Sequence, residues 1–137
     1  MPPDAALLIV AALLTVAVLG GAALRRRDGR RRTVRARRFD PEHAHPASLG
    51  ARATLVQFST EMCARCPQVR RMLREIVSAD DGLRHVEVDL THRPDLSAHY
   101  RVLQTPTTFL VDRAGVVRSR FSGVPQRQAL TDALAAL

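Results

Sequence analysis

The pattern of hydrophobic and polar positions divides the chain into an apolar run, a polar segment and a longer region of mixed periodicity. The apolar run covers residues 5–24, where twenty consecutive residues carry no charge. As a helix, this run would be about 30 Å long, which matches the hydrocarbon core of a bilayer. It has no polar face that would let it lie on a soluble domain. We therefore predict a single-pass transmembrane anchor at residues 1–24.

The region at residues 49–137 shows the periodicities of alternating strands and helices. Short runs rich in β-forming residues predict four strands, at 53–58, 85–90, 107–111 and 116–121. Apolar residues at helical spacing predict helices at 67–78, 94–100 and 125–137. The helix between the first two strands makes them a parallel pair, and a short turn makes the last two antiparallel. The predicted fold class is α/β, with a mixed sheet of about four strands and helices on both faces.

The polar segment at residues 25–48 is rich in arginine and then in other polar residues, with Pro41 and Pro46 near its end. We interpret it as a juxtamembrane tether between the anchor and the domain at residues 49–137. Within it, residues 33–39 alternate weakly and are compatible with a short strand at the edge of the sheet.

Charge is concentrated in the tether. The formal net charge is +8, and residues 25–38 alone contain nine Arg and one Asp. Because positive charge next to a span stays in the cytoplasm, we expect the C-terminal domain on the cytoplasmic side. The alternative for the apolar run is a cleaved secretory signal, but residues 1–4 lack the basic side chain that a signal carries. We expect this tract to contact the lipid membrane. We do not expect nucleic acid as a partner, because no aromatic residue interleaves the arginines.

Cys63 and Cys66 are the only cysteines, and three kinds of site would use such a pair. A zinc site needs four ligands, and His43 and His45, which would complete it, lie in the predicted tether; no metal is expected. An inert disulfide would close a very small loop and would tend to be reduced in the cytoplasm. A redox pair fits better, because a helix N-terminus and the nearby Arg65 favour a thiolate on Cys63 while Cys66 is covered one turn into the helix.

Residues 53–137 resemble the thioredoxin family. The resemblance rests on "TLVQFSTEMCARC", the acidic strand "HVEVDL", the segment "YRVLQTPTTFLVDRAGVVRSRFSG" and the final helix. It implies a thioredoxin-like mixed sheet with flanking helices. It also implies that Cys63 attacks the disulfide of a substrate and that Cys66 resolves the mixed disulfide.

The resemblance also implies four substrate-binding positions. Pro106 would face the cysteines as a cis proline, Thr105 would hydrogen-bond the substrate backbone, and Gly123 would line the groove. Met62 stands where typical thioredoxins have Trp before the first cysteine. The dipeptide between the cysteines is Ala-Arg where thioredoxins carry Gly-Pro, and this difference leaves the strength of the pair as a reductant open.

The most informative departure from the family pattern is Gln57. Thioredoxins usually have a buried Asp there, which assists proton transfer to and from the resolving cysteine, whereas Gln cannot titrate. Glu61 and His85 are the nearest proton-transfer candidates in the sequence, and His85 occupies the position of a strand lysine of the family. Either water or one of these groups transfers the proton in place of the missing acid, or the mixed disulfide is resolved slowly.

The sequence therefore predicts a membrane-tethered thiol–disulfide oxidoreductase that reduces protein disulfides at the cytoplasmic face. Its partners would be disulfide-containing protein substrates and an electron-donating reductase or thiol protein, and no non-protein cofactor is required. Two alternatives stay open. One is an outward-facing thiol oxidase or reductase, and the other is a non-catalytic interaction module that keeps the fold.

Overall fold

One mixed sheet of five strands organises the domain in the computed structural model, which describes residues 3–27, 29–33 and 37–137. The strand order is β1-β5-β4-β2-β3. β2 and β3 are parallel, and the other neighbouring pairs are antiparallel. The strand bounds are β1 (Arg31–Thr33), β2 (Ala53–Ser59), β3 (Leu83–Asp89), β4 (Thr107–Asp112) and β5 (Val117–Ser122). The predicted mixed sheet is confirmed, and β1 adds a fifth strand to the four that we expected.

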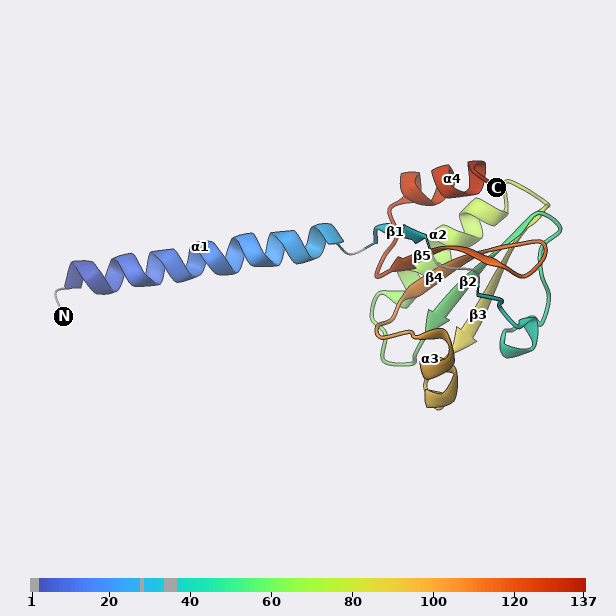
Figure 1. Ribbon diagram of the computed structural model, residues 1–137, viewed down its shortest axis with the longest axis horizontal. Coiled ribbons are helices and arrows are strands. Elements are labelled where there is room, and N and C mark those ends of the chain that lie inside the picture. The colour runs from blue at the N-terminus through green and yellow to red at the C-terminus, as the bar shows by residue number, and fades with distance from the viewer. Residues whose placement is uncertain (1–2, 28, 34–36) are drawn as a thin grey trace.

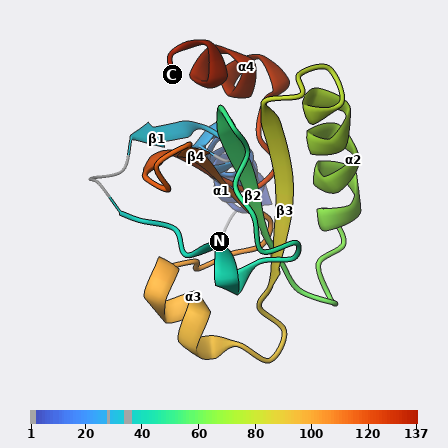
Figure 2. The ribbon, with the colours of Figure 1, turned by 90° about the vertical axis from the view of Figure 1, so that its right-hand side faces the viewer.

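Helices cover both faces of this sheet, as Figure 2 shows. α2 (Cys66–Val77) and α4 (Arg127–Ala135) lie on one face, and α3 (Pro94–Tyr100) lies on the other. The side chains of β2 are buried along the whole strand, because the strand is central and both its faces are covered. Ala53 and Leu55 of β2 join the apolar cluster under α2 and α4, and Val56 and Phe58 join the cluster under α3.

The segment at residues 37–48 is part of the domain, which corrects our interpretation of it as tether. Phe39 is 3% exposed, and its ring packs against Phe58 at a centroid distance of 6.5 Å and against Tyr100 at 5.5 Å. A short 3-10 helix, η1 (Pro41–His43), follows, and His45 then forms an isolated antiparallel bridge with Glu87. The sequence did not indicate that Phe39 is a core residue, because a single aromatic residue in a polar segment shows no hydrophobic periodicity.

The edge strand is also displaced from its predicted position. We expected it at residues 33–39, but β1 ends at Thr33 and pairs with β5, with Arg31 opposite Phe121. Residues 34–36 of the predicted strand lie outside the described residues. Arg38 forms only an isolated bridge with Val116.

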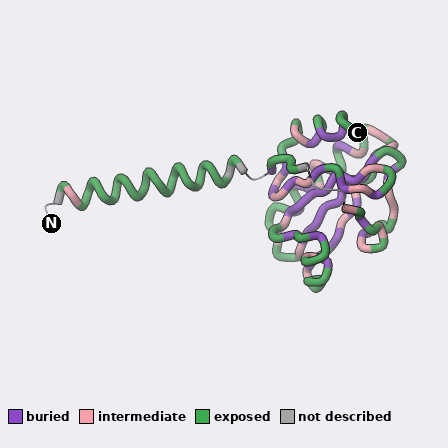
Figure 3. Tube along the Cα trace, in the orientation of Figure 1, coloured by how far each residue is buried: buried purple, intermediate pink, exposed green. Residues whose placement is uncertain are grey.

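The N-terminal helix α1 (Pro3–Arg27) projects away from the domain, and its residues 6–24 are exposed (Figures 1 and 3). Residues 4–24 reach a mean hydropathy of 2.6, and none of the apolar window is buried against the domain. By length and composition α1 is able to cross a membrane, although a signal sequence near the N-terminus passes the same test.

Candidate functional site

The two cysteines form a disulfide where β2 passes into α2. Their Cα atoms are 5.4 Å apart. Cys66 is 2% exposed, whereas Cys63 is only half-buried, so one sulfur is accessible and the other is shielded. The helix begins at Cys66 and not at Cys63, and the Cys66 N–H donates to the Cys63 carbonyl at 3.2 Å. Cys66 is therefore the first residue of the helix and is covered by the sheet, rather than lying one turn in as we expected.

A groove of about 290 Å³ opens beside the disulfide. It joins three segments that are far apart in the sequence: the cysteine loop, the segment before β4 and the turn after β5. The residues that line it are Met62, Cys63, Ala64, Arg65, Gln104, Thr105, Pro106 and Gly123. All four predicted substrate-binding positions are thus brought together with Cys63. Met62 is 93% exposed, which leaves an apolar side chain in water beside the attacking sulfur.

The segment before β4 is held against the cysteine loop from both sides. The Thr105–Pro106 peptide bond is cis, as the resemblance implied. The N–H of Gly123 donates to the Pro106 carbonyl at 2.8 Å, and the hydroxyls of Thr60 and Thr105 lie 3.4 Å apart. Within the described part of the chain, the backbone N–H and C=O of Thr105 have no backbone partner. These two groups are available to an extended peptide, which pairs with free backbone edges.

A polar network replaces the expected buried acid beneath Cys66. Gln57 is fully buried, and its Nε2 donates to the Cys66 carbonyl at 3.0 Å. Its Oε1 accepts from Nε2–H of His85 at 3.2 Å, so the side chain is satisfied at both ends. Thr108 lies opposite Gln57 in the β2–β4 register, and its buried hydroxyl has no hydrogen-bond partner among the described residues. Of the proton-transfer candidates, the structure joins Gln57 and His85.

The network also sets the protonation of its neighbours. Burial lowers the pKa of His85 to about 4, and the cations Arg70 and Arg74 act in the same direction while the carboxylate of Glu87 opposes them. Burial alone would raise the pKa of Glu87, but hydrogen bonds from Arg70 and Ser59 outweigh it and lower this pKa. His85 is therefore neutral at pH 7, and Glu87 is ionised beside it.

Glu61 does not join this network. Its side chain is exposed, and its backbone N–H donates to the Thr91 hydroxyl at 3.0 Å. The residue that sequence reasoning missed is Glu87, whose Oε2 accepts from Arg70 Nε at 2.8 Å. The alternation of "HVEVD" was the available signal, because it puts Glu87 on the same face of β3 as His85.

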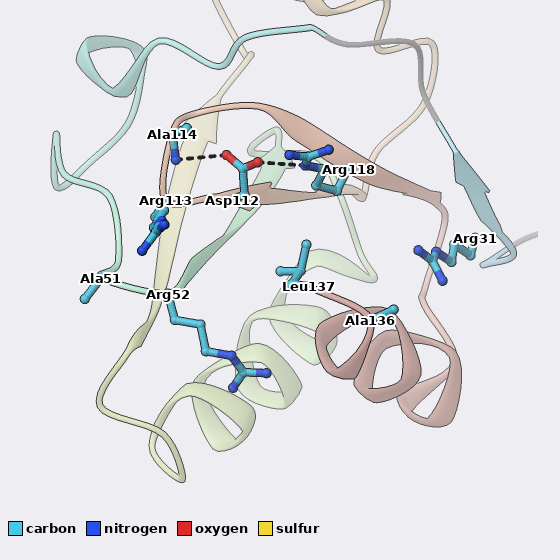
Figure 4. A pocket seen from close by; sticks show the side chains of 9 residues that line it. All are labelled: Arg31, Ala51, Arg52, Asp112, Arg113, Ala114, Arg118, Ala136 and Leu137. Carbon is cyan, nitrogen blue, oxygen red and sulfur yellow. Dashed lines mark hydrogen bonds and ion pairs between the residues drawn. The ribbon is translucent and has the colours of Figure 1, made fainter.

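A larger cavity of about 930 Å³ lies at the opposite end of the sheet, beside the β4–β5 turn (Figure 4). Its lining residues are Arg31, Ala51, Arg52, Asp112, Arg113, Ala114, Arg118, Ala136 and Leu137. Asp112 accepts from Arg118 Nε at 2.6 Å, and Arg52 is paired with Asp80, so part of the arginine charge is already neutralised. The lining contains one side-chain carboxylate, Asp112, which Arg118 holds in an ion pair, and it contains no cysteine among the described residues. We therefore place the candidate site at the smaller groove, which Cys63 lines.

No group of three or more His, Cys, Asp or Glu side chains among the described residues has an arrangement that would hold a metal ion.

Comparison with known proteins identifies the family. The model of the thioredoxin family matches residues 34–136, and the chain belongs to this family. The match begins before residue 37, in agreement with the packing of residues 37–48 on the domain. A search of curated proteins finds no match.

Solved structures of thioredoxins share the fold. Mitochondrial thioredoxin 3 from Saccharomyces cerevisiae, in its oxidized form, is 22% identical over 62% of this chain and 78% of its own, with a TM-score of 0.54. Chloroplastic thioredoxin z is 20% identical over 63% of this chain and 78% of its own, also with a TM-score of 0.54. At these identities the likeness concerns the fold. The thioredoxin fold together with the Cys63–Cys66 disulfide supports thiol–disulfide oxidoreductase activity.

Proposed function

We propose that this protein is a membrane-tethered thiol–disulfide oxidoreductase that reduces disulfides in proteins. The observation that carries the proposal is that the two cysteines of the disulfide, Cys63 and Cys66, differ in solvent exposure. Cys63 opens into the groove beside Thr105 and Pro106, and Cys66 is covered. A dithiol with one accessible sulfur attacks a substrate first and is released by its partner afterwards.

The reaction proceeds by two exchanges of sulfur–sulfur bonds. In the reduced protein, the Cys63 thiolate attacks one sulfur of the substrate disulfide, and the other substrate sulfur leaves as a thiolate and takes up a proton. The Cys66 thiol then loses its proton and attacks the Cys63 sulfur, which releases the second substrate thiol. The substrate gains two electrons and two protons, and the protein is left with the Cys63–Cys66 disulfide. A reductase or a dithiol protein must return the two electrons.

The groove supplies binding and positioning for these steps. The free backbone groups of Thr105 would pair with the substrate chain on one side of the reacting sulfur. Met62 would contact apolar substrate side chains at the rim. Gln57, which does not titrate, leaves the proton of Cys66 to water or to the neutral His85 that it hydrogen-bonds.

The anchor would be α1, and the arginine tract after it favours a cytoplasmic domain. The side of the membrane is tested with a single cysteine at Leu137→Cys in a Cys63→Ser/Cys66→Ser background. A membrane-impermeant thiol reagent added to intact cells should leave this cysteine unlabelled and should label it after lysis. Labelling in intact cells would support the outward-facing alternative.

The catalytic proposal is tested by two single substitutions in the full-length protein. Cys63→Ser should abolish reduction of a disulfide-bonded peptide, and Cys66→Ser should accumulate a mixed disulfide between Cys63 and that peptide. An interaction module would bind the peptide equally well in all three proteins and reduce it in none. Unchanged reduction by Cys63→Ser would refute the proposal.

The direction of electron flow follows from an equilibrium redox titration of the cysteine pair. A potential near about −270 mV, as in thioredoxin, would agree with a reductant. A potential near about −120 mV is that of a strong oxidant and would favour the oxidase alternative.

A further inference from the structure

The connection between α1 and the domain is short, which restricts how far the domain lies from the bilayer. The apolar part of α1 ends at Leu24, and the helix ends at Arg27. Those three residues advance about 4.5 Å along the helix, and the step from Arg27 to Gly29 spans at most about 7 Å. Gly29 therefore lies within about 12 Å of the end of the apolar span, whereas each headgroup layer is about 5–8 Å thick.

Gly29 is itself fastened to the catalytic end of the sheet. Its N–H donates to the Ser122 carbonyl at 2.6 Å. A Cβ added to Gly29 would lie 2.2 Å from the carbonyl oxygen of Val124, and its φ is +74°, so only glycine allows this close approach. Between these two contacts lies Gly123, which lines the groove and donates to the Pro106 carbonyl. A series of contacts thus connects Gly29, two residues after the end of α1, to the groove.

The surface around the groove suits a position next to lipid. Met62 and Leu103 are each 93% exposed, and Leu103 directly precedes Gln104 in the groove lining. Arg65 and Arg101 are also exposed in the same region. Exposed apolar side chains with neighbouring cations are stabilised at a membrane surface, where anionic headgroups attract the positive charge. Figure 1 shows the β4–β5 turn on the far side of the domain from α1.

We infer that the groove is held at the membrane surface, and that its substrates are disulfides in segments of membrane proteins that lie next to the lipid headgroups. This inference rests on the proposed function and specifies its substrate class. It holds for either side of the membrane, because the short connection acts in the same way on both. A disulfide far above the bilayer reaches the groove less often than one beside it.

The position of the groove is measured with fluorophores on single cysteines in the full-length Cys63→Ser/Cys66→Ser protein. Ala64→Cys places the probe in the groove lining, and Ala51→Cys places it in the cavity at the opposite end (Figure 4). Both alanines are exposed, and the seven residues of β2 between the two ends span about 20 Å. The labelled proteins are reconstituted in phosphatidylcholine–phosphatidylglycerol vesicles that carry a nitroxide on a fraction of the headgroups, and flotation verifies membrane association.

The probe at Ala64→Cys should be quenched several-fold more than the probe at Ala51→Cys. A flexible Gly/Ser spacer of about 30 residues, inserted after Arg27, has a reach of about 30 Å and should remove the difference. Equal quenching at the two positions in the protein without the spacer would overturn the inference while leaving the catalytic proposal intact. Failure to float with the vesicles would overturn the anchoring and this inference together.

The substrate class is measured with the reduced wild-type protein in the same vesicles. One transmembrane peptide carries its disulfide directly after the span, and a second carries it beyond a flexible linker of about 30 residues. The first should be reduced several-fold faster, and the spacer variant should reduce both at similar rates. A soluble disulfide peptide, whose rate of reduction is measured in the same vesicles, serves as the control without a membrane span. Reduction of all three at equal rates would overturn the inference alone, and reduction of none would overturn the proposed function as well.

Discussion

Replacing His85 by Gln should reduce the loss in the free energy of unfolding that occurs when the pH falls from 7 to 4. The imidazole of His85 is mostly buried, and it donates from Nε2–H to Gln57 Oε1 at 3.2 Å. Burial lowers its pKa from 6.5 to about 4. Gln is also able to donate this hydrogen bond, but it does not titrate. The substitution His85→Gln therefore removes the titration and retains the contact.

The magnitude follows from the two pKa values. In the folded protein His85 stays neutral down to about pH 4, whereas in the unfolded chain it takes up a proton near pH 6.5. The unfolded state then binds more protons between these values, so the free energy of unfolding falls as the pH falls through this window. The difference between 6.5 and about 4 corresponds to about 3 kcal/mol. Water in the adjoining cavity, which His85 lines with Arg84, reduces the effect to about 2–3 kcal/mol.

Urea unfolding of the full-length protein in detergent micelles at pH 7 and pH 4 measures this effect. Tyr100, the single tyrosine of a chain without tryptophan, is buried, and its fluorescence reports the transition. Between pH 7 and pH 4 the wild type should lose about 2–3 kcal/mol more stability than His85→Gln. The control is His92→Gln, which replaces an exposed histidine outside this network. Parallel profiles for wild type and His85→Gln would refute the argument that burial keeps this imidazole neutral.

Three further predictions concern the core and the cysteine network. Gln57→Asp should speed the resolution of the mixed disulfide by Cys66, by up to about 10²-fold if the new carboxylate acts as a general base, and rapid-mixing thiol exchange at equal rates would contradict it. Phe39→Ala should destabilise the domain by about 3–5 kcal/mol in urea unfolding, because the ring is buried, whereas a residue in a flexible tether would have no effect. Thr54→Val should lower the free energy of unfolding by about 1–3 kcal/mol, because the Thr54 hydroxyl accepts from the buried backbone N–H of Gly50 at 2.8 Å. Thr108→Val should cost nothing, because the Thr108 hydroxyl has no partner among the described residues, and equal losses for the two variants would argue against this account.

At the position of the family's buried Asp, this chain has a neutral side chain that forms hydrogen bonds and does not titrate. Gln57 spans the distance between the Cys66 carbonyl and the His85 ring, so this buried polar side chain is hydrogen-bonded at both ends without carrying charge. Glu87 provides the nearest ionised group of this network, and Arg70 pairs with it from α2. The arrangement avoids the cost of burying an unpaired carboxylate beneath the helix.

Much of the domain followed from local patterns. The apolar run, the four strands at 53–58, 85–90, 107–111 and 116–121, and the helix after the cysteines were all predicted, since their side chains repeat with the period of the element that buries them. The cysteine pair followed from the identity and spacing of two residues. The β1 strand was misplaced, because a three-residue edge strand pairs on one side only and needs little apolar pattern.

The sequence by itself thus determined the position of the cysteine pair, the order of the elements and the length of the apolar span, because each depends on the identity or the periodicity of neighbouring residues. Only the tertiary structure decided that Phe39 belongs to the core, that Glu61 lies apart from the cysteine network, and that Gly29 contacts the strand end beside Gly123. Such contacts join residues far apart in the chain. They depend on the strand order and register of the folded sheet, to which no local pattern gives access.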